Sequence, residues 1–144
     1  MKRQLFSTLA LCALVAVSVG AQQNPMRPGR WQSTMQMQMP NMPMQMPPMT
    51  TAQCITAEEL EKDPASGLPR GAQNAPQNAC KMSDYKVSGN TVTWKMVCSG
   101  AQAMTGEGEL TFVQDTYTGT MKLEGPQGAM AMKMTGKRLG DCMP

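Results

Sequence analysis

The chain has 144 residues, a formal net charge of +3 and no histidine. This length fits one domain, and the nearly balanced charge gives no support for binding to nucleic acid or to anionic lipid. Because histidine is the commonest general base, the usual partner of a serine or cysteine nucleophile and a common zinc ligand, its absence leads us to expect a protein that is not an enzyme.

The first 21 residues have the features of an export signal. Lys2 and Arg3 precede an apolar run at residues 5–19 that is too short to span a membrane comfortably, and the small residues around position 20 predict cleavage before Gln22. Cys12 follows a leucine inside this run, which disfavours a lipid anchor. We therefore expect a signal peptide at 1–21, a single domain at 22–144 and no stable membrane span after cleavage.

Residues 30–39 alternate between two faces of an expected strand. Trp31, Ser33 and the methionines at 35, 37 and 39 share one face, and glutamine and threonine share the other. This alternation predicts a half-buried strand in which methionine is the apolar partner. Residues 40–48 contain four prolines, which predict a loop or a sheet edge. Residues 49–55 resume an extended pattern.

A short helix is expected at residues 56–62. Thr56 and Glu59 have the spacing of a capping box, in which each side chain accepts a backbone N–H from the other residue. Asp63 and Pro64 are expected to end the helix. Residues 64–79 are rich in Pro, Gly, Ala, Asn and Gln, so this segment is expected to be a mobile surface loop.

The remainder of the chain predicts a meander of short strands. Turn signals occur at residues 88–90, 114–115 and 125–128, and residues 136–142 are expected to form a terminal tail. The strands are expected at residues 82–87, 91–98, 106–113, 116–123 and 129–135. The predicted fold class is therefore all-β, an antiparallel meander of about seven strands that forms a curved sheet, a sandwich or a partly open barrel.

Four cysteines remain after the signal segment: Cys54, Cys80, Cys98 and Cys142. An even number in an exported chain predicts two disulfides. A three-residue loop at 88–90 would place Cys80 opposite Cys98, whereas a two-residue turn would place Lys81 there. We favour the pairs Cys80–Cys98 and Cys54–Cys142. The pairs Cys54–Cys80 and Cys98–Cys142 are the alternative.

The segment 35–49 contains seven methionines in fifteen residues and supports two interpretations. Thioether sulfur is a soft ligand that suits Cu(I) or Ag(I), and Cu(I) is the one cofactor that the sequence suggests. The candidate ligands are Met42, Met44, Met46 and Met49. The other interpretation is packing, because methionine fills irregular cores and Met130, Met132 and Met134 repeat the alternation elsewhere. We assign Met35, Met37 and Met39 to the core and leave both interpretations open for the loop methionines.

A third hypothesis is a binding face on the sheet. A curved sheet lined by methionine and tryptophan could hold an apolar ligand or a partner peptide, since methionine-rich surfaces adapt to varied shapes. Trp31 and Trp94 could line such a face, but we favour the interpretation that both are core residues.

Several segments together resemble the family catalogued as domain of unknown function 3617. They read "RPGRWQSTMQMQMP", "QCITAEEL", "YKVSGNTVTWKMVCSG", "GEGELTFVQDTYTGTMK" and "MKMTGKRLGDC", and the resemblance extends from residue 27 to residue 142. The family consists of exported bacterial proteins without an established activity. The resemblance implies a disulfide-bonded β protein of the periplasm and no catalytic residue. We expect a protein that acts by binding or in the cell envelope, with a partner that the sequence does not identify.

Overall fold

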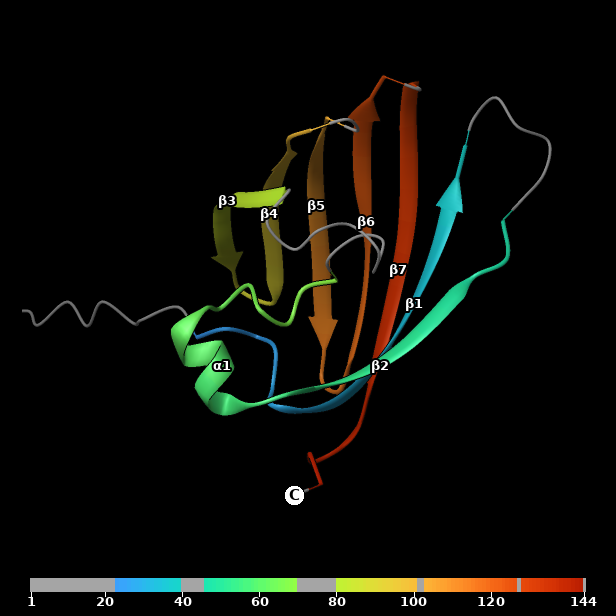
Figure 1. Cartoon of the computed structure of the whole chain (residues 1–144). Coiled ribbons are helices and arrows are strands. Elements are labelled where there is room, and N and C mark those ends of the chain that lie inside the picture. The colour runs from blue at the N-terminus through green and yellow to red at the C-terminus, as the bar shows by residue number, and fades with distance from the viewer. Residues whose placement is uncertain (1–22, 40–45, 70–79, 101–102, 127, 144) are drawn as a thin grey trace, which may run out of the picture.

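The computed structural model describes residues 23–39, 46–69, 80–100, 103–126 and 128–143. Seven strands form one antiparallel sheet in the order β2-β1-β7-β6-β5-β4-β3, with one short helix (Figure 1). The elements are β1 (Gly29–Gln38), β2 (Met49–Ile55), α1 (Ala57–Lys62), β3 (Cys80–Ser88), β4 (Thr91–Cys98), β5 (Met104–Val113), β6 (Thr116–Gly125) and β7 (Gly128–Gly140). The predicted all-β meander with one helix is confirmed, and the sheet does not close into a barrel.

The order of the strands follows from short connections between neighbours. Strands β3 to β6 each pair with the next strand along the chain, and β1 then pairs with β7 and carries β2 on its outer side. Residues 136–140, expected to lie in a terminal tail, belong instead to β7. They extend this strand because they pair with β1. This long-range pairing could not be predicted from turn signals near the end of the chain.

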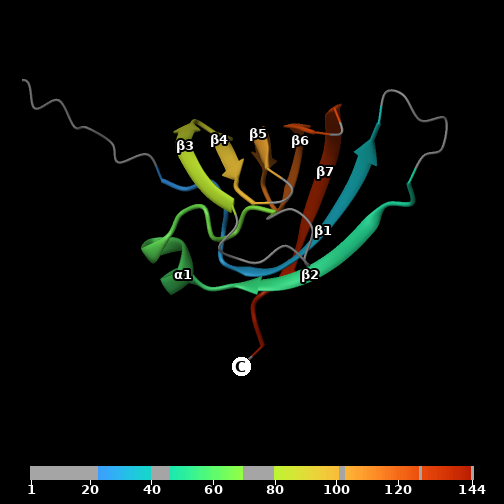
Figure 2. The same ribbon diagram turned by 45° about the horizontal axis from the view of Figure 1, so that its top comes forward.

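The sheet is curled into a trough with two unlike faces (Figure 2). On β5, Leu110 and Phe112 are buried inside the trough, whereas Glu107 and Glu109 are exposed on the convex face. Most of the other strands show the same alternation, with threonine and lysine common on the outside, whereas β2 is exposed along most of its length. This is the pattern of a sheet that buries one face and leaves the other in water.

Glycines on the inner face allow large rings to lie against the sheet. A Cβ atom at Gly108 would overlap the Trp94 ring, and one at Gly136 would overlap the Tyr117 ring. Each ring therefore occupies the space that a side chain of the neighbouring strand would fill. Such glycines favour tight bending of a sheet, and here they lie on β5 and β7, in the middle of the trough.

Helix α1 lies between the end of β2 and β3, at one end of the trough (Figure 2). The predicted capping box is present: the Thr56 hydroxyl accepts the Glu59 N–H at 3.2 Å, and the Glu59 carboxylate accepts the Thr56 N–H at 2.8 Å. The helix buries Leu60 in the core. Thus the local sequence sets where the helix begins, and its single buried side chain, Leu60, sets which side faces the sheet.

The expectation of a surface loop at 64–79 is wrong for residues 64–69. Ala65 and Leu68 are buried in the core, because turns at Asp63 fold the chain back over the trough. The Asp63 carboxylate accepts the Ala65 N–H at 3.0 Å, and the Asp63 carbonyl accepts the Ser66 N–H at 2.9 Å. The polar composition of this segment serves the turns rather than mobility. Residues 70–79 lie outside the described residues.

Both favoured disulfides, Cys80–Cys98 and Cys54–Cys142, are confirmed. The explanation for the first was wrong, because Gly89 and Asn90 form a two-residue turn between Ser88 and Thr91 rather than a three-residue loop. A bulge between Ser83 and Lys86, with a positive φ of 53° at Asp84, adds one residue to β3. That extra residue shifts the register by one and brings Cys80 opposite Cys98.

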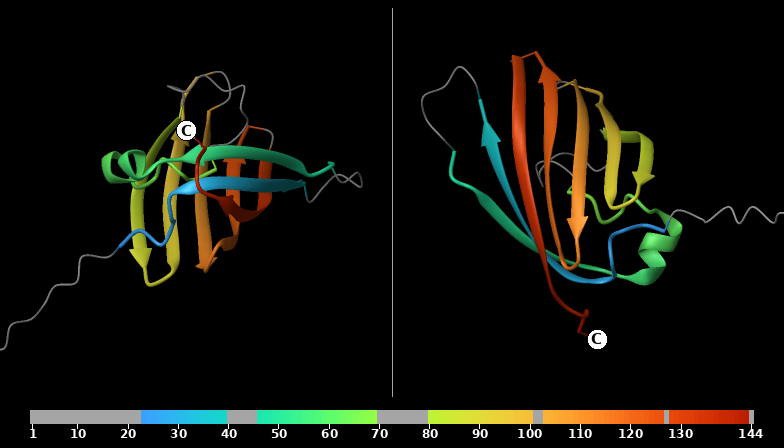
Figure 3. Two further views of the ribbon diagram at one scale, coloured as in Figure 1. Left: turned by 90° about the horizontal axis from the view of Figure 1, so that it is seen from below. Right: turned by 180° about the vertical axis from the view of Figure 1, so that it is seen from behind.

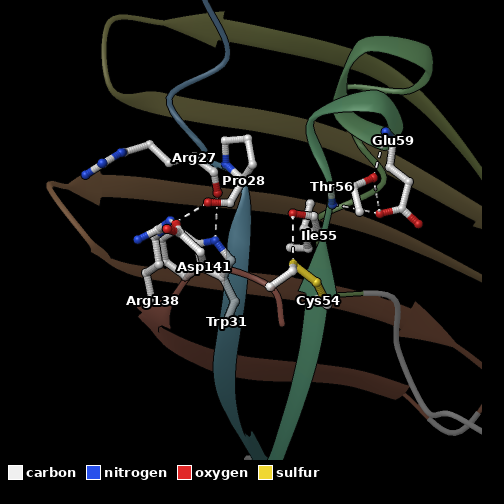
Figure 4. Close-up of a disulfide and its surroundings, with 10 residues drawn as sticks. Arg27, Pro28, Trp31, Cys54, Ile55, Thr56, Glu59, Arg138 and Asp141 are labelled. Atoms are coloured by element: carbon white, nitrogen blue, oxygen red, sulfur yellow. Dashed lines mark hydrogen bonds and ion pairs between the residues drawn. A yellow bond between two sulfur atoms is a disulfide. The ribbon is translucent and has the colours of Figure 1, made fainter. Parts of the chain in front are cut away.

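The second disulfide ties the C-terminal tail to the edge of the sheet. Cys54 lies in β2 (Figure 4) and Cys142 follows β7, so the order of the strands requires the tail to cross β1 to reach its partner. Beside it, the Arg138 side chain donates a hydrogen bond to the Pro28 carbonyl at 2.7 Å. A disulfide typically contributes about 2–4 kcal/mol to stability, and this one fixes β2 onto the sheet.

Candidate functional site

One half of the trough, which we call the aromatic half, is built from Trp31, Phe112 and Tyr117. The Trp31 and Tyr117 rings are stacked with centroids 5.7 Å apart, and Phe112 meets Trp31 edge-on at 6.2 Å. All three side chains are buried, and Leu60 and Leu68 belong to the same core. Pairs of this geometry add to the stability that burial alone provides.

The polar atoms of these rings have partners inside the protein. The Trp31 indole N–H donates to the Arg27 carbonyl at 2.8 Å, and the Tyr117 hydroxyl donates to the Ser33 hydroxyl at 2.6 Å. Burial raises the pKa of Tyr117, and the hydrogen bond to Ser33 offsets part of this rise. The aromatic half is thus a closed, hydrogen-bonded core. Trp31 and Trp94 are both buried, so they fill the trough and do not line an open binding face.

The other half of the trough is lined mainly by methionine. We call this surface the methionine face, and the strand register brings its side chains together: Met35 lies opposite Met134, Met37 opposite Met132, and Met132 in turn opposite Met121. Its members are Met35, Met37, Met82, Met96, Met104, Met121, Leu123, Met130, Met132 and Met134. Paired residues on one face of a sheet lie within reach of each other, so six strands contribute to one continuous surface.

The methionine face has a buried floor and a partly exposed rim. Met121, Met132 and Met134 are at most 3% exposed and form the floor with Met96 and Leu123. The rim consists of Met35, Met37, Met82, Met104 and Met130, which are half-buried. The inward positions beside these methionines are occupied by Gly106, Gly108 and the Cys80–Cys98 disulfide, so the described face carries no charge.

The candidate metal ligands take different places. Met49 pairs with Met35 on the edge of the methionine face and is 50% exposed, and Met46 is 44% exposed in the segment before β2. Met42 and Met44 lie outside the described residues. The core assignment fits Met35 and Met37 only in part, since both are half-buried against the core. Among the described residues, no group of three or more histidine, cysteine or acidic side chains could hold a metal ion.

Sequence reasoning missed the contribution of the middle strands. Met82, Met96, Met104 and Met121 were not recognised as part of a candidate site, although each occupies an inward position of its strand. The available signal was that methionine recurs at inward positions on strand after strand. Only the order and register of the strands, however, show that these side chains share one surface.

Comparison with known proteins places the chain in a family. The two disulfides are consistent with an exported protein, and the described part of the chain contains no helix of the length and apolar character that a membrane crossing requires. No curated protein and no solved structure matches the chain significantly. A family model described as "Protein of unknown function (DUF3617)" matches residues 26–142, and the chain belongs to this family.

Proposed function

We propose that this protein is an exported, non-enzymatic binding protein of the bacterial periplasm, and that the methionine face holds a flexible apolar chain of the acyl type. The observation that carries the proposal is a rim of half-buried methionines around a buried apolar floor, with no charged side chain on the described part of this face. Methionine has three rotatable bonds and a polarizable sulfur, so such a surface adapts to ligands of varied shape.

The contrast with the aromatic half supports this location for the ligand. The rings of Trp31, Phe112 and Tyr117 fill their half of the trough, and Leu60 of α1, Ala65 and Leu68 belong to the same core. A ligand that lacks charge at its buried end matches the uncharged methionine face, because a buried charge without a partner is strongly unfavourable. The face therefore suits the aliphatic part of a ligand and leaves any polar headgroup to water.

The chemistry of the side chains supports binding rather than catalysis. The whole sequence has no histidine. The pKa of Glu59 is lowered by its hydrogen bonds to Thr56 in the helix cap, and the pKa values of Tyr85 and Tyr117 are raised chiefly by burial. These shifts have structural causes, and they do not arise from an acid and a base placed together around a shared substrate.

Quenching of tryptophan fluorescence by a brominated fatty acid tests the proposal. Trp94 packs over Gly108, which pairs on its other side with Met121, so bromine atoms on the methionine face lie near this indole. We expect saturable quenching in the wild-type protein. Met37→Gln combined with Met130→Gln adds polar groups to the rim and should weaken binding about tenfold, or about 1.4 kcal/mol.

Met143→Gln is the matched control, because Met143 is 80% exposed and lies outside the methionine face. Its titration should follow that of the wild-type protein. Quenching that never saturates in the wild-type protein, or that is equally strong in the rim variant, contradicts the proposal.

A second candidate function is binding of Cu(I) or Ag(I), and the strand register is the observation that favours it. Met49, Met35 and Met134 are neighbours across β2, β1 and β7. The next row consists of Met37, Met132 and Met121 across β1, β7 and β6. Each row brings three thioethers together, and soft sulfur ligands select Cu(I). The sheet thus supplies candidate ligands in addition to the loop methionines 42, 44 and 46.

Competition with a Cu(I) chelator tests this second function and locates the ligands. Leucine is close to methionine in volume, so Met35→Leu with Met37→Leu removes one sulfur from each row without opening a cavity. These changes should abolish Cu(I) retention if the sheet binds the metal, while binding of the fatty acid persists. Leucine at positions 42, 44 and 46 instead tests the loop. Stoichiometric removal of Cu(I) from the wild-type protein by the chelator would end the metal hypothesis.

A further inference from the structure

The two edges of the sheet differ in how well they are protected against further strand pairing. The outer strand β3 carries Lys81 and Lys86, and its ladder is interrupted by the bulge at Asp84, where φ is 53°. Charged side chains and bulges are the usual devices that prevent a strand from being added to an edge. The β3 edge is therefore blocked by its own sequence.

The β2 edge has none of these devices. From Met49 to Ile55 the strand contains no charged residue and no proline, and its register with β1 runs through seven consecutive pairs without a shift. Five of its seven residues are exposed. Among the described residues no strand pairs with its outer side (Figure 3). Its outward backbone N–H and C=O groups are thus arranged to accept another strand.

This edge is also held in place before any partner arrives. The Cys54–Cys142 disulfide fixes one end of β2, and the helix cap at Thr56 follows directly. Near the other end of β2, the Thr50 hydroxyl shares a hydrogen bond of 3.0 Å with the Thr34 hydroxyl of β1. A strand that is already ordered loses little conformational entropy on pairing.

We propose that β2 pairs antiparallel with β2 of a second copy of this chain, so that two sheets join into one continuous sheet around a two-fold axis. An antiparallel pair centred on Ala52 places this small side chain opposite its own copy and Met49 opposite Ile55. No like charges meet, since β2 carries none. Two-fold dimers are the commonest symmetric assemblies, and the blocked β3 edge stops growth at two copies.

The oligomeric state of the purified, disulfide-bonded protein tests the proposal by sedimentation equilibrium from about 1 μM to about 1 mM. We expect a dimer that forms with rising concentration. Ala52→Lys should abolish it, because two lysines then face each other at the centre of the pair. Thr120→Lys, at an exposed position of the inner strand β6, is the matched control and should dimerise as the wild-type protein does.

Charge reversal sharpens the test. Ala52→Glu should be monomeric alone and should form a mixed dimer with Ala52→Lys, because opposite charges then face each other. Gln53→Lys replaces Ala52→Lys if circular dichroism shows that the latter is unfolded. A wild-type protein that stays monomeric over the whole concentration range overturns the proposal, even if the β2 edge binds a strand of another molecule. A dimer that persists in the lysine variant, or a charge-reversed mixture that stays monomeric, also overturns it.

Discussion

The two halves of the trough use the same strands for different purposes. At one end, the rings of Trp31, Phe112 and Tyr117 are fixed by stacking, by hydrogen bonds and by the packing of Leu60. At the other end, flexible methionines form a surface without charge and with a half-buried rim. The difference teaches that one continuous sheet can separate rigidity from adaptability simply by changing side-chain type along its strands.

The largest expected effect breaks the aromatic half. Trp31→Ala removes the central ring, which is 0% exposed, and should lower the free energy of unfolding by about 3–5 kcal/mol. Met37→Ala on the same strand should cost only about 1–2 kcal/mol, because Met37 is half-buried. Urea unfolding of both variants measures the difference. Equal losses would show that the two halves do not differ in their contribution to stability.

The next prediction concerns the glycine that supports the Tyr117 ring. Gly136→Ala places a methyl group where this ring lies, so it should destabilise the protein by about 1–3 kcal/mol through overpacking. Gly125→Ala is the matched control, since its Cβ would meet its nearest neighbour at an ordinary 3.5 Å. Thermal unfolding compares them. A tolerated Gly136→Ala would mean that the aromatic half adapts as readily as the methionine face.

A smaller effect is expected from the buried hydrogen bond between Tyr117 and Ser33. Tyr117→Phe should cost about 1–2 kcal/mol, because the Ser33 hydroxyl then loses its partner in a buried site. Adding Ser33→Ala to Tyr117→Phe should lower the free energy of unfolding only a little further. A double-mutant cycle by urea unfolding measures this coupling, and fully additive losses would contradict it.

The same tyrosine predicts a loss of stability at alkaline pH. Burial raises the pKa of Tyr117, so the folded protein favours the neutral phenol. The stabilisation that the neutral Tyr117 phenol gives the folded protein is fully present below the unfolded pKa of about 10. It is lost as pH rises through the higher pKa of the folded protein. Stability measured between neutral and alkaline pH should therefore fall less steeply in Tyr117→Phe. The pKa of Tyr85 is also raised, so some loss of stability at alkaline pH should remain in Tyr117→Phe.

The smallest effect lies at the edge of the aromatic half, in the helix cap. Thr56→Ala removes the acceptor of the Glu59 N–H and should cost about 1 kcal/mol. Hydrogen bonds from Thr56 lower the pKa of Glu59, so the carboxylate stabilises the fold above its unfolded pKa and this effect disappears as pH falls through the lower folded pKa. Titration by NMR should show the Glu59 pKa rising in part in Thr56→Ala, because the side-chain hydrogen bond is lost while the backbone N–H of residue 56 still donates. An unchanged pKa would contradict the capping role.

Much of the fold was readable from local patterns, as the alternation after Trp31 and the capping box at Thr56 show. The bulge in β3 was missed, although the inward positions change from Met82 to Tyr85, a spacing of three that a regular strand does not allow. The burial of Leu68 could not be read from a polar, turn-rich segment, because it depends on the trough beneath it. The methionine face required the register of six strands, which no single strand contains.

The disulfide between Cys54 and Cys142 has a consequence for the order of maturation. For a chain that crosses a membrane N-terminus first, Cys80 and Cys98 can join as soon as one hairpin has emerged, since 18 positions separate them. Cys54 must wait for a partner 88 positions away, and loop closure over such a distance is slow. Until Cys142 is available, Cys54 can pair wrongly with Cys80. Correct maturation therefore requires that the Cys80–Cys98 disulfide forms first and that the Cys54–Cys142 disulfide, which fixes β2 at the edge of the sheet, forms last.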